Sequence, residues 1–387
     1  MRLGDFCTTN IKSYSEKENW NVIYYLDTSN LTKGKISEIQ TLIPDIDKIP
    51  SRAKRKVSEG DILFSTVRPN QRHYGIIKKE IPYLLVSTGF AVITVNKKIA
   101  DEDYIYYFLT QDQIIEHLQT IAEQSTSAYP SIKPTDIENI EINLPTLSVQ
   151  KAIGNLLRAL DEKIEVNNRI NDNLQHQALA IFQNYFFDIN ELPVGWSKGY
   201  LLDIADYLNG LAMQKFRPSN GEIGLPVLKI KELRQGTCDT SSEFCSPAIK
   251  DEFIVHDGDV IFSWSGSLLV DFWCGGTCGL NQHLFKVTSS VYDKWFYYLW
   301  TTYHLKRFIA IATDKATTMG HIKREELSKS EVIIPSDADY QEINATLKPI
   351  IDLIVANRIA NRKFAKIRDK LLPRLMSGEI DVSNLHI

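Results

Sequence analysis

Apolar residues recur at alternating intervals of four and three between residues 146 and 187, a spacing that places them on one stripe of a helix. The stripe comprises Ile153, Leu157, Leu160, Ile164, Asn167, Asn171, Leu174, Ala178, Ile181 and Tyr185. Pro145 interrupts any preceding helix, and Thr146 can cap the first turn. The pattern therefore predicts a helix of about 40 residues, which is roughly 60 Å long at 1.5 Å per residue.

The same stripe returns 190 residues later. It comprises Ile343, Leu347, Ile350, Ile354, Asn357, Asn361, Phe364, Arg368, Leu371 and Leu375. Its first four positions are again apolar, its next two are again asparagine, and Pro335 and Ser336 repeat the start. A helix this long needs a partner to cover its apolar stripe, so we predict that the two helices pack as a coiled coil.

Asn167, Asn171, Asn357 and Asn361 lie at matching places in the two stripes. A buried asparagine in a coiled coil lowers stability but fixes the register, because its amide is satisfied only opposite another polar group. The alternative is that these asparagines face solvent. Their matched placement favours the register role.

The segments before the two helices also repeat. Residues 60–65 read Gly-Asp-Ile-Leu-Phe-Ser and residues 258–263 read Gly-Asp-Val-Ile-Phe-Ser, each typical of a buried strand after a turn. Residues 83–86 and 89–95 predict further strands, and a helix is expected from Asp103 to about Ala122. Residues 293–299 and 322–323 repeat residues 103–109 and 132–133, whereas the loops after the repeated strands differ.

We therefore predict an α+β chain with a pseudo-two-fold internal repeat. Mixed α/β domains are expected at residues 1–145 and 190–335. A long helix follows the first at residues 146–189, and a long helix with a C-terminal tail follows the second at residues 336–387. Loops that vary beside a shared scaffold are the usual place for binding residues.

Composition narrows the class of protein. The chain has 387 residues, 43% hydrophobic and 24% charged, with a net charge of −4, which argues against coating nucleic acid by bulk electrostatics. No apolar run predicts a membrane span or a signal peptide, so we expect a cytoplasmic protein. Five scattered cysteines predict free thiols; a zinc site using Cys274, Cys278 and His283 is the less favoured alternative, and no metal is expected.

Motifs of catalysis are missing from the sequence. It has no phosphate-binding loop, dinucleotide-binding turn, zinc-protease motif, nucleophile elbow or amino-methyltransferase tetrapeptide. Pro44-Asp45 could begin a nuclease motif, but Asp61 is not followed by lysine two positions on. We read Asp61 and Asp259 as turn residues. No catalytic residue is predicted.

Groups that suit nucleic acid are present in the loops. Guanidinium and carboxamide groups read the edges of guanine and adenine, and exposed lysines suit phosphates. The candidates in the first domain are Lys54, Arg55, Arg68, Asn70, Gln71, Arg72 and Lys133. The candidates in the second domain are Ser265, Ser267, Asn281, Gln282, His283, Lys323 and Arg324. The alternative for each is ordinary loop surface.

The duplicated order of these motifs resembles the specificity subunit of a Type I restriction-modification enzyme. The resemblance rests on the Gly-Asp-Ile/Val-Leu/Ile-Phe-Ser strands, the Ile/Leu-Pro boundary before each helix, Gln150 and Gln341 near the helix starts, and Leu-Met-Ser-Gly-Glu-Ile at residues 375–380. It implies two target recognition domains that each read half of a split site in double-stranded DNA. It also implies an antiparallel coiled coil that sets the spacer.

The resemblance further implies partners and cofactors. Two methyltransferase subunits would dock on the helices and bring S-adenosylmethionine, and restriction subunits would bring ATP and Mg²⁺, with no cofactor bound by this chain. Arg368 departs from the repeat, because the first helix has Ala178 at the matching place; strict symmetry is therefore not expected there. A different class of protein, a coiled-coil scaffold that binds proteins and not DNA, remains the alternative.

Overall fold

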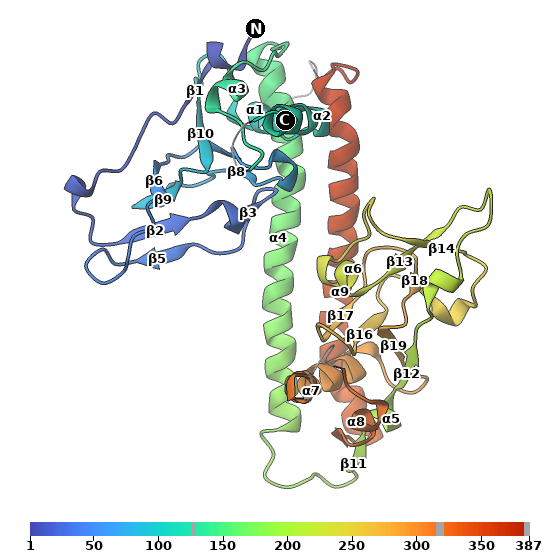
Figure 1. Cartoon of the computed structure of the whole chain (residues 1–387). Helices are drawn as coiled ribbons and strands as arrows, with labels where there is room; N and C mark the ends of the chain where they lie inside the picture. The colour runs from blue at the N-terminus through green and yellow to red at the C-terminus, as the bar shows by residue number, and fades with distance from the viewer. Residues whose placement is uncertain (126–128, 315–320, 383–387) are drawn as a thin grey trace. The chain divides into compact units, whose positions relative to one another are not determined.

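The computed structural model describes residues 1–125, 129–314 and 321–382. Residue contacts divide the chain into two compact units, the first made of Met1–Glu162 with Lys366–Ile387 and the second of Lys163–Ala365. The chain passes between the units twice, once within α4 (Leu147–Phe186) and once within α9 (Asp337–Met376). Each unit therefore contains the start of one long helix and the end of the other (Figure 1).

The first unit is built on two four-stranded sheets. One has the order β1-β10-β7-β8, with each neighbouring pair antiparallel. Its strands are β1 (Cys7–Thr9), β10 (Phe90–Val95), β7 (Ile62–Ser65) and β8 (Tyr74–Ile76). The other has the order β5-β2-β9-β6. Its strands are β5 (Gln40–Leu42), β2 (Ile23–Leu26), β9 (Leu84–Ser87) and β6 (Ala53–Lys56).

The second unit repeats both sheets in the same order. The first is β12-β19-β16-β17 and the second is β14-β13-β18-β15. The strands of the first are β12 (Asp206–Asn209), β19 (Leu284–Thr288), β16 (Val260–Ser263) and β17 (Leu269–Phe272). The strands of the second are β14 (Phe244–Cys245), β13 (Leu225–Leu228), β18 (Cys278–Leu280) and β15 (Ile254–Val255). The central pair is parallel in both units, β2 with β9 and β13 with β18. The internal repeat predicted from the sequence is therefore confirmed.

Each repeated strand is fully buried, which explains its continuous apolar sequence. Ile62–Ser65 and Val260–Ser263 are buried at every residue. A strand that is buried on both faces has a continuous apolar sequence and not an alternation of apolar and polar residues. Large aromatic side chains complete the packing; Tyr104 is 1% exposed and Trp295 1%, so the aromatic runs belong to the cores.

The prediction of one helix from Asp103 to about Ala122 is wrong in one respect. The segment forms two helices, α1 (Glu102–Leu109) and α2 (Asp112–Glu123). Gln111 is extended, and its side-chain amide donates to the carbonyl of Phe108, while the Thr110 hydroxyl donates to the carbonyl of Tyr107. Polar side chains that bond the nearby backbone compete with the helix. The second unit has one continuous helix here, α7 (Lys294–Asp314).

The two long helices have the bounds that the stripes predict. Every one of the twenty stripe residues is buried or half-buried. In the first unit the Arg368 guanidinium pairs with Asp161, and in the second Asn167 and Asn171 bond to α9. Asn167 of α4 contacts Asn361 of α9, and Asn171, further along α4, contacts Asn357, which lies earlier in α9. The helices therefore pack antiparallel.

The asparagines meet across this packing within the second unit. Asn167 Nδ2 donates to Asn361 Oδ1 at 2.8 Å, and Asn357 Nδ2 donates to Asn171 Oδ1 at 2.9 Å. Asn171 Nδ2 also donates to the carbonyl of Ile354 at 3.3 Å. Asn167 and Asn171 are buried, so solvent does not supply these bonds. Register setting by these pairs remains a proposal that the geometry favours.

Short elements complete the chain. The helices are α3 (Pro134–Glu138), α5 (Leu201–Ile204), α6 (Ile230–Gln235) and α8 (Arg324–Ser328). The remaining strands are β3 (Leu31–Thr32) with β4 (Lys35–Ile36) and β11 (Ser197–Tyr200) with β20 (Glu331–Ile334). The cysteines are free thiols, and among the described residues no helix has the length and apolar character needed to span a membrane.

Candidate nucleic-acid interface

Four polar candidates of the second domain lie together where three strands end or begin. Ser265 follows β16, and Asn281, Gln282 and His283 connect β18 to β19. The backbone holds this connection firmly, because Asn281 N donates to the carbonyl of Leu228 and Gln282 N to that of Leu211. The carboxyl ends of parallel strands are a common place for ligand-binding groups.

His283 is the centre of this group. Its Nδ1 lies 3.0 Å from Ser265 Oγ, and its Nε2 lies 3.4 Å from Gln282 Nε2. Asn281 Oδ1 accepts the backbone N–H of His283 at 3.2 Å, and Ser265 and Asn281 are 4% and 6% exposed. Ser265 and Asn281 are therefore oriented supports, whereas Gln282 and His283 are half-buried and retain accessible surface.

An indole and a second imidazole adjoin the same group. Trp264 Nε1 donates to Asn209 Oδ1 at 2.9 Å, and its ring lies 6.1 Å from the His283 ring and 6.2 Å from that of His321. Residues Ser265 and His321 form a β-bridge. A flat aromatic ring beside carboxamide and imidazole groups can contact a base face and base edges.

The first domain has the same frame with different side chains. Ile132 N donates to the carbonyl of Thr66 at 2.9 Å, as Ile322 N does to that of Trp264 at 3.1 Å, and Val67 forms a β-bridge with Ser131. Ser87 at the end of β9, followed by Thr88 and Gly89 before β10, is the counterpart of Asn281-Gln282-His283. The bulky groups of the second domain are therefore replaced by small ones here.

Longer side chains come instead from the β7–β8 loop of the first domain. Arg68 and Arg72 flank the 3-10 helix Pro69–Gln71, and both have left-handed backbones, with φ of 48° and 57°. Such a conformation costs a non-glycine residue roughly 1 kcal/mol or more, and clusters of it are typical of functional loops. Asn70 and Gln71 lie between the two arginines, with exposed side chains.

Contacts at both ends stabilise this loop. Arg72 Nη1 donates to Asp112 Oδ1 at 2.7 Å, the Arg68 guanidinium lies 5.2 Å from the Tyr129 ring centre, and Asn70 N donates to Gln119 Oε1 at 3.2 Å. Burial opposes the charge of Arg72, but the Asp112 carboxylate raises its pKa above the usual value. Arg72 is thus engaged within the protein, whereas Asn70 and Gln71 are exposed side chains that the loop presents.

The remaining candidates lie apart from these two groups or at their margins. Lys54 is exposed and Arg55 half-buried on β6, the edge strand of its sheet. Lys133 and Lys323 are exposed immediately before α3 and α8, Ser267 is exposed in the β16–β17 turn, and Arg324 donates to the carbonyl of Tyr207 at 3.0 Å. The lysines suit phosphate contacts better than base reading.

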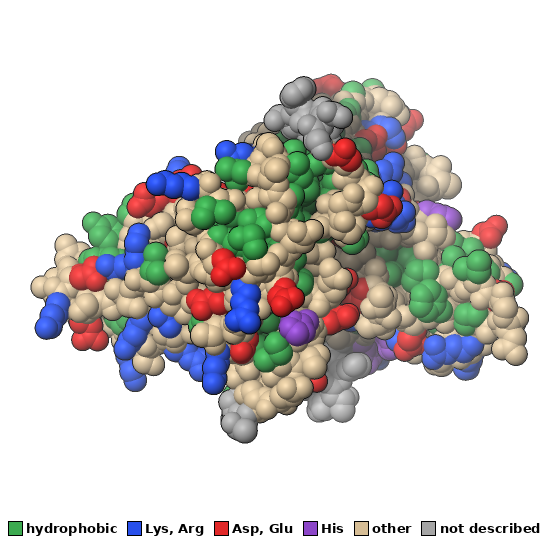
Figure 2. All heavy atoms as spheres, turned by 90° about the horizontal axis from the view of Figure 1, so that it is seen from above, with side chains coloured by type: hydrophobic (Ala, Val, Ile, Leu, Met, Phe, Trp, Pro, Cys, Tyr) green, Lys and Arg blue, Asp and Glu red, His purple; other side chains and the backbone are tan. Residues whose placement is uncertain are grey.

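The face drawn in Figure 2 carries lysine and arginine side chains interspersed with acidic ones, without a continuous basic surface. On α9 several basic groups are neutralised within the second unit. Arg362 forms two bonds of 2.7 Å to the carboxylate of Asp257, and Arg358 forms one of 2.6 Å to Asp271. These two arginines therefore attach α9 to the second domain.

Two pockets of the described residues differ in volume, and the one beside the start of α4 and the end of α9 in the first unit has about 200 Å³. The enclosed pocket beside α4 and α9 in the second unit has a volume of about 10 Å³, room for no more than a water molecule. Among the described residues no group of three histidine, cysteine or acidic side chains could hold a metal ion. The arrangement can bind and orient a ligand through hydrogen bonds and stacking.

Comparison with known proteins identifies the family to which this chain belongs. A model of the type I restriction modification DNA specificity domain matches residues 1–176 and again residues 193–362. The chain belongs to this family. As a specificity subunit, it is a DNA-recognition protein and not a catalytic one.

Individual relatives span most of the chain. It is 26% identical over 368 residues to the type I restriction enzyme MjaIX specificity subunit of Methanocaldococcus jannaschii, which covers 87% of this chain and 84% of that protein. It is 21% identical over 460 residues to the HindI specificity subunit of Haemophilus influenzae, which covers 98% of each. A crystal structure of the S subunit from M. genitalium covers 97% of this chain and 95% of that one, with a TM-score of 0.57 and 13% identity, and shows a shared fold.

Three residues of this specificity subunit's candidate interface were missed by sequence reasoning. Trp264 and Asn209 are joined by a hydrogen bond across 55 positions, and Asp112 holds Arg72 across 40. Trp264 had a local signal, because it directly follows a repeated strand. Asn209 and Asp112 had none, since only the sheet order and the helix break bring them to the site.

Proposed function

We propose that the chain reads a split sequence in double-stranded DNA, with one half-site contacted by each repeated domain. One observation carries the proposal: two sheets of the same order carry different side chains at the same edge. Two domains that recognise different DNA sequences require a common backbone structure that carries different side chains at the binding edge.

The chemistry of each edge supports a different readout. The first domain would read through Asn70 and Gln71 in the β7–β8 loop, which Arg72 and Asp112 hold in place. The second would read through Gln282 and His283, with Trp264 beside them. Carboxamides recognise adenine N6 and N7 in the major groove. Lys54, Lys133 and Lys323 would contact phosphates.

The long helices would set the distance between half-sites and dock two methyltransferase subunits. Large apolar side chains are exposed on them, with Ile170 41% and Leu353 46% accessible, as a protein interface requires. S-adenosylmethionine would come with those subunits, and ATP and Mg²⁺ with restriction subunits. The working complex would be cytoplasmic. The specificity-subunit names of the relatives support these assignments.

Selection of bound sequences from a random duplex pool tests the proposal, using the chain co-expressed with its genomic neighbours. We expect enrichment of two short motifs at a fixed gap, with retention falling as salt rises because phosphate contacts release counterions. A scaffold that binds only proteins would enrich no motif and would show no salt-dependent retention of DNA.

A further inference from the structure

An ion pair stands within the helix packing of the first unit. The Arg368 guanidinium on α9 bonds to Asp161 on α4, and Asp161 also accepts a hydrogen bond of 2.7 Å from the Tyr107 hydroxyl. The two charged side chains are only 28% and 24% exposed. The carboxylates of Asp161 and Asp369 overcome the effect of burial and raise the pKa of Arg368 above its usual value.

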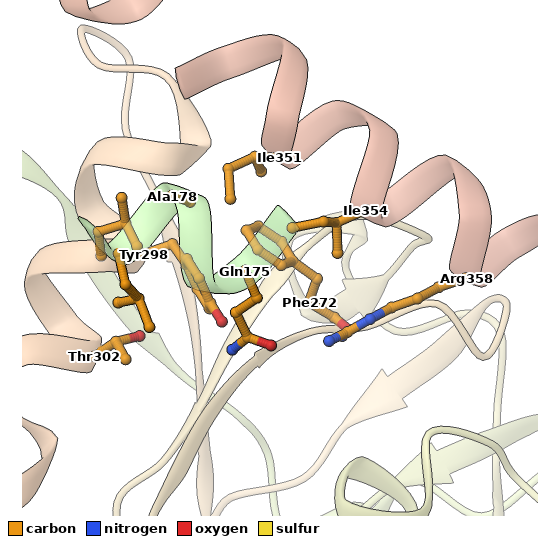
Figure 3. A pocket seen from close by; sticks show the side chains of 10 residues that line it. Gln175, Ala178, Phe272, Tyr298, Thr302, Ile351, Ile354 and Arg358 are labelled. Atoms are coloured by element: carbon orange, nitrogen blue, oxygen red, sulfur yellow. The ribbon is translucent and has the colours of Figure 1, made fainter. Parts of the chain in front are cut away.

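The matching place in the second unit is apolar. The offset of 190 relates Asp161 to Ile351 and Ala178 to Arg368. Ile351 and Ala178 line one small pocket, are 2% and 1% exposed, and point into it together in Figure 3. The repeat has therefore replaced one complementary pair, aspartate with arginine, by another, isoleucine with alanine.

This exchange makes the two helices different as partners. If α4 packed against α4 of a second copy in the same register, Asp161 would face Ala178. If α9 packed against another α9, Arg368 would face Ile351. An α4–α4 pair would leave Asp161 largely buried without its counter-ion, and an α9–α9 pair would leave Arg368 only its exposed neighbour Asp369 as a counter-ion. Loss of a partner for a largely buried charge is strongly unfavourable.

The asparagines do not distinguish these arrangements. Asn167 and Asn171 of α4 match Asn357 and Asn361 of α9, so a helix paired with its own copy would still place asparagine opposite asparagine. The other stripe positions of α4 and α9 are apolar in both copies apart from Arg368. Asn361 also bonds Asn168, whose counterpart in α9 is Arg358, but the charged pair that depends on which helix is the partner is Arg368 with Asp161.

We propose that the Asp161–Arg368 pair selects the partner in this coiled coil, so that the first repeat packs with the second and not with a second copy of itself. In this proposal the asparagines set the register of the two helices, and the ion pair determines which helix is the partner. This inference is independent of DNA reading.

The test uses the full chain cut after folding. A specific protease site is inserted between Asn190 and Glu191, which are both exposed. Two preparations of different mass are cleaved, mixed and incubated, and native mass spectrometry counts mixed pairs and self-pairs of the two halves. We expect at least a tenfold excess of mixed pairs over each self-pair, and a tenfold ratio corresponds to about 1.4 kcal/mol.

Two double variants separate selection from simple stability. Asp161→Ile with Arg368→Ala makes the two places alike and should bring self-pairs to statistical proportions. Asp161→Arg with Arg368→Asp keeps a complementary pair and should keep the excess of mixed pairs. Equal proportions in the unsubstituted chain, or the same excess in the apolar double variant, would overturn the inference.

Discussion

Gln71 and Gln282 present the same carboxamide from different segments of the repeated frame. Gln71 lies in the β7–β8 loop and Gln282 in the β18–β19 connection. We predict that Gln71→Ala relaxes one position of one half-site and Gln282→Ala one position of the other. Loss of a bidentate contact reduces base discrimination by about 1–3 kcal/mol. Sequence selection with each variant measures this.

The control for both is Gln341→Ala, which removes an exposed carboxamide at the start of α9. Its selected motif should equal that of the unsubstituted chain. If Gln71→Ala and Gln282→Ala alter the same half-site, the assignment of one domain to each half-site is wrong.

Asp103 gives a prediction for pH. Burial raises its pKa to about 6, although Arg158 at 2.8 Å acts in the opposite direction. A carboxyl group whose folded pKa lies above its unfolded value binds its proton more tightly in the folded protein. Its contribution to stability is therefore full below about pH 4 and is lost as the pH rises towards 6.

We expect Asp103→Asn to remove this loss, which is on the order of 1–3 kcal/mol between pH 4 and pH 7. Urea unfolding followed by circular dichroism across that range measures it. Asp172→Asn, at an exposed position of α4, controls for the removal of a negative charge. A slope unchanged by Asp103→Asn would contradict the explanation.

Residue types in the loops predict candidate binding groups, but they do not predict which of these groups contact other parts of the protein. Ser265 and His283 are both candidates from the sequence, and the structure brings Ser265 Oγ within 3.0 Å of His283 Nδ1 across 18 positions. Arg72 was expected to read bases, but its guanidinium is engaged by Asp112. Short-range sequence cannot show that partner, because the contact depends on how α2 packs.

Within the long helices, Asn171 joins two elements through both ends of its amide. Its Nδ2 donates to the carbonyl of Ile354 and its Oδ1 accepts from Asn357. Asn171→Ala would leave Asn357 and a backbone carbonyl without these bonds in a buried place. We predict a loss of about 1–3 kcal/mol in the free energy of unfolding.

Asn173→Ala is the matched control, since Asn173 is exposed on the same helix. It should change stability by less than about 0.5 kcal/mol in the same denaturant titration. Equal losses for the two variants would show that the Asn171 bonds add nothing beyond helix propensity.

Periodicity predicted elements well where packing repeats along the chain. The stripes gave both long helices to within a residue or two, because each stripe must stay on one face for its whole length. The break between α1 and α2 was not predicted. It depends on Thr110 and Gln111 bonding the backbone, while Thr301 of α7 bonds the carbonyl of Tyr297 and stays helical.

At the scale of the whole molecule, the repeat extends to ion pairs. Asp103 pairs with Arg158 in the first unit and Asp293 with Lys348 in the second, each partner displaced by 190. The offset of 190 relates Gln150 to Tyr340, and the Tyr340 hydroxyl accepts the backbone N–H of Asp293.

The most direct test of the proposal that the long helices set the distance between two DNA half-sites is to lengthen both helices. The units divide between Glu162 and Lys163 in α4 and between Ala365 and Lys366 in α9. One heptad inserted at each point adds about 10 Å and keeps the stripe in phase. At 3.4 Å per base pair, this corresponds to about three base pairs.

Sequence selection with this variant and the unsubstituted chain, each co-expressed with its genomic neighbours, gives the result. We predict the same two half-sites separated by a gap about three base pairs longer. An unchanged gap, or altered half-sites, would contradict the proposal that the domains recognise the half-sites and the helices set the gap between them.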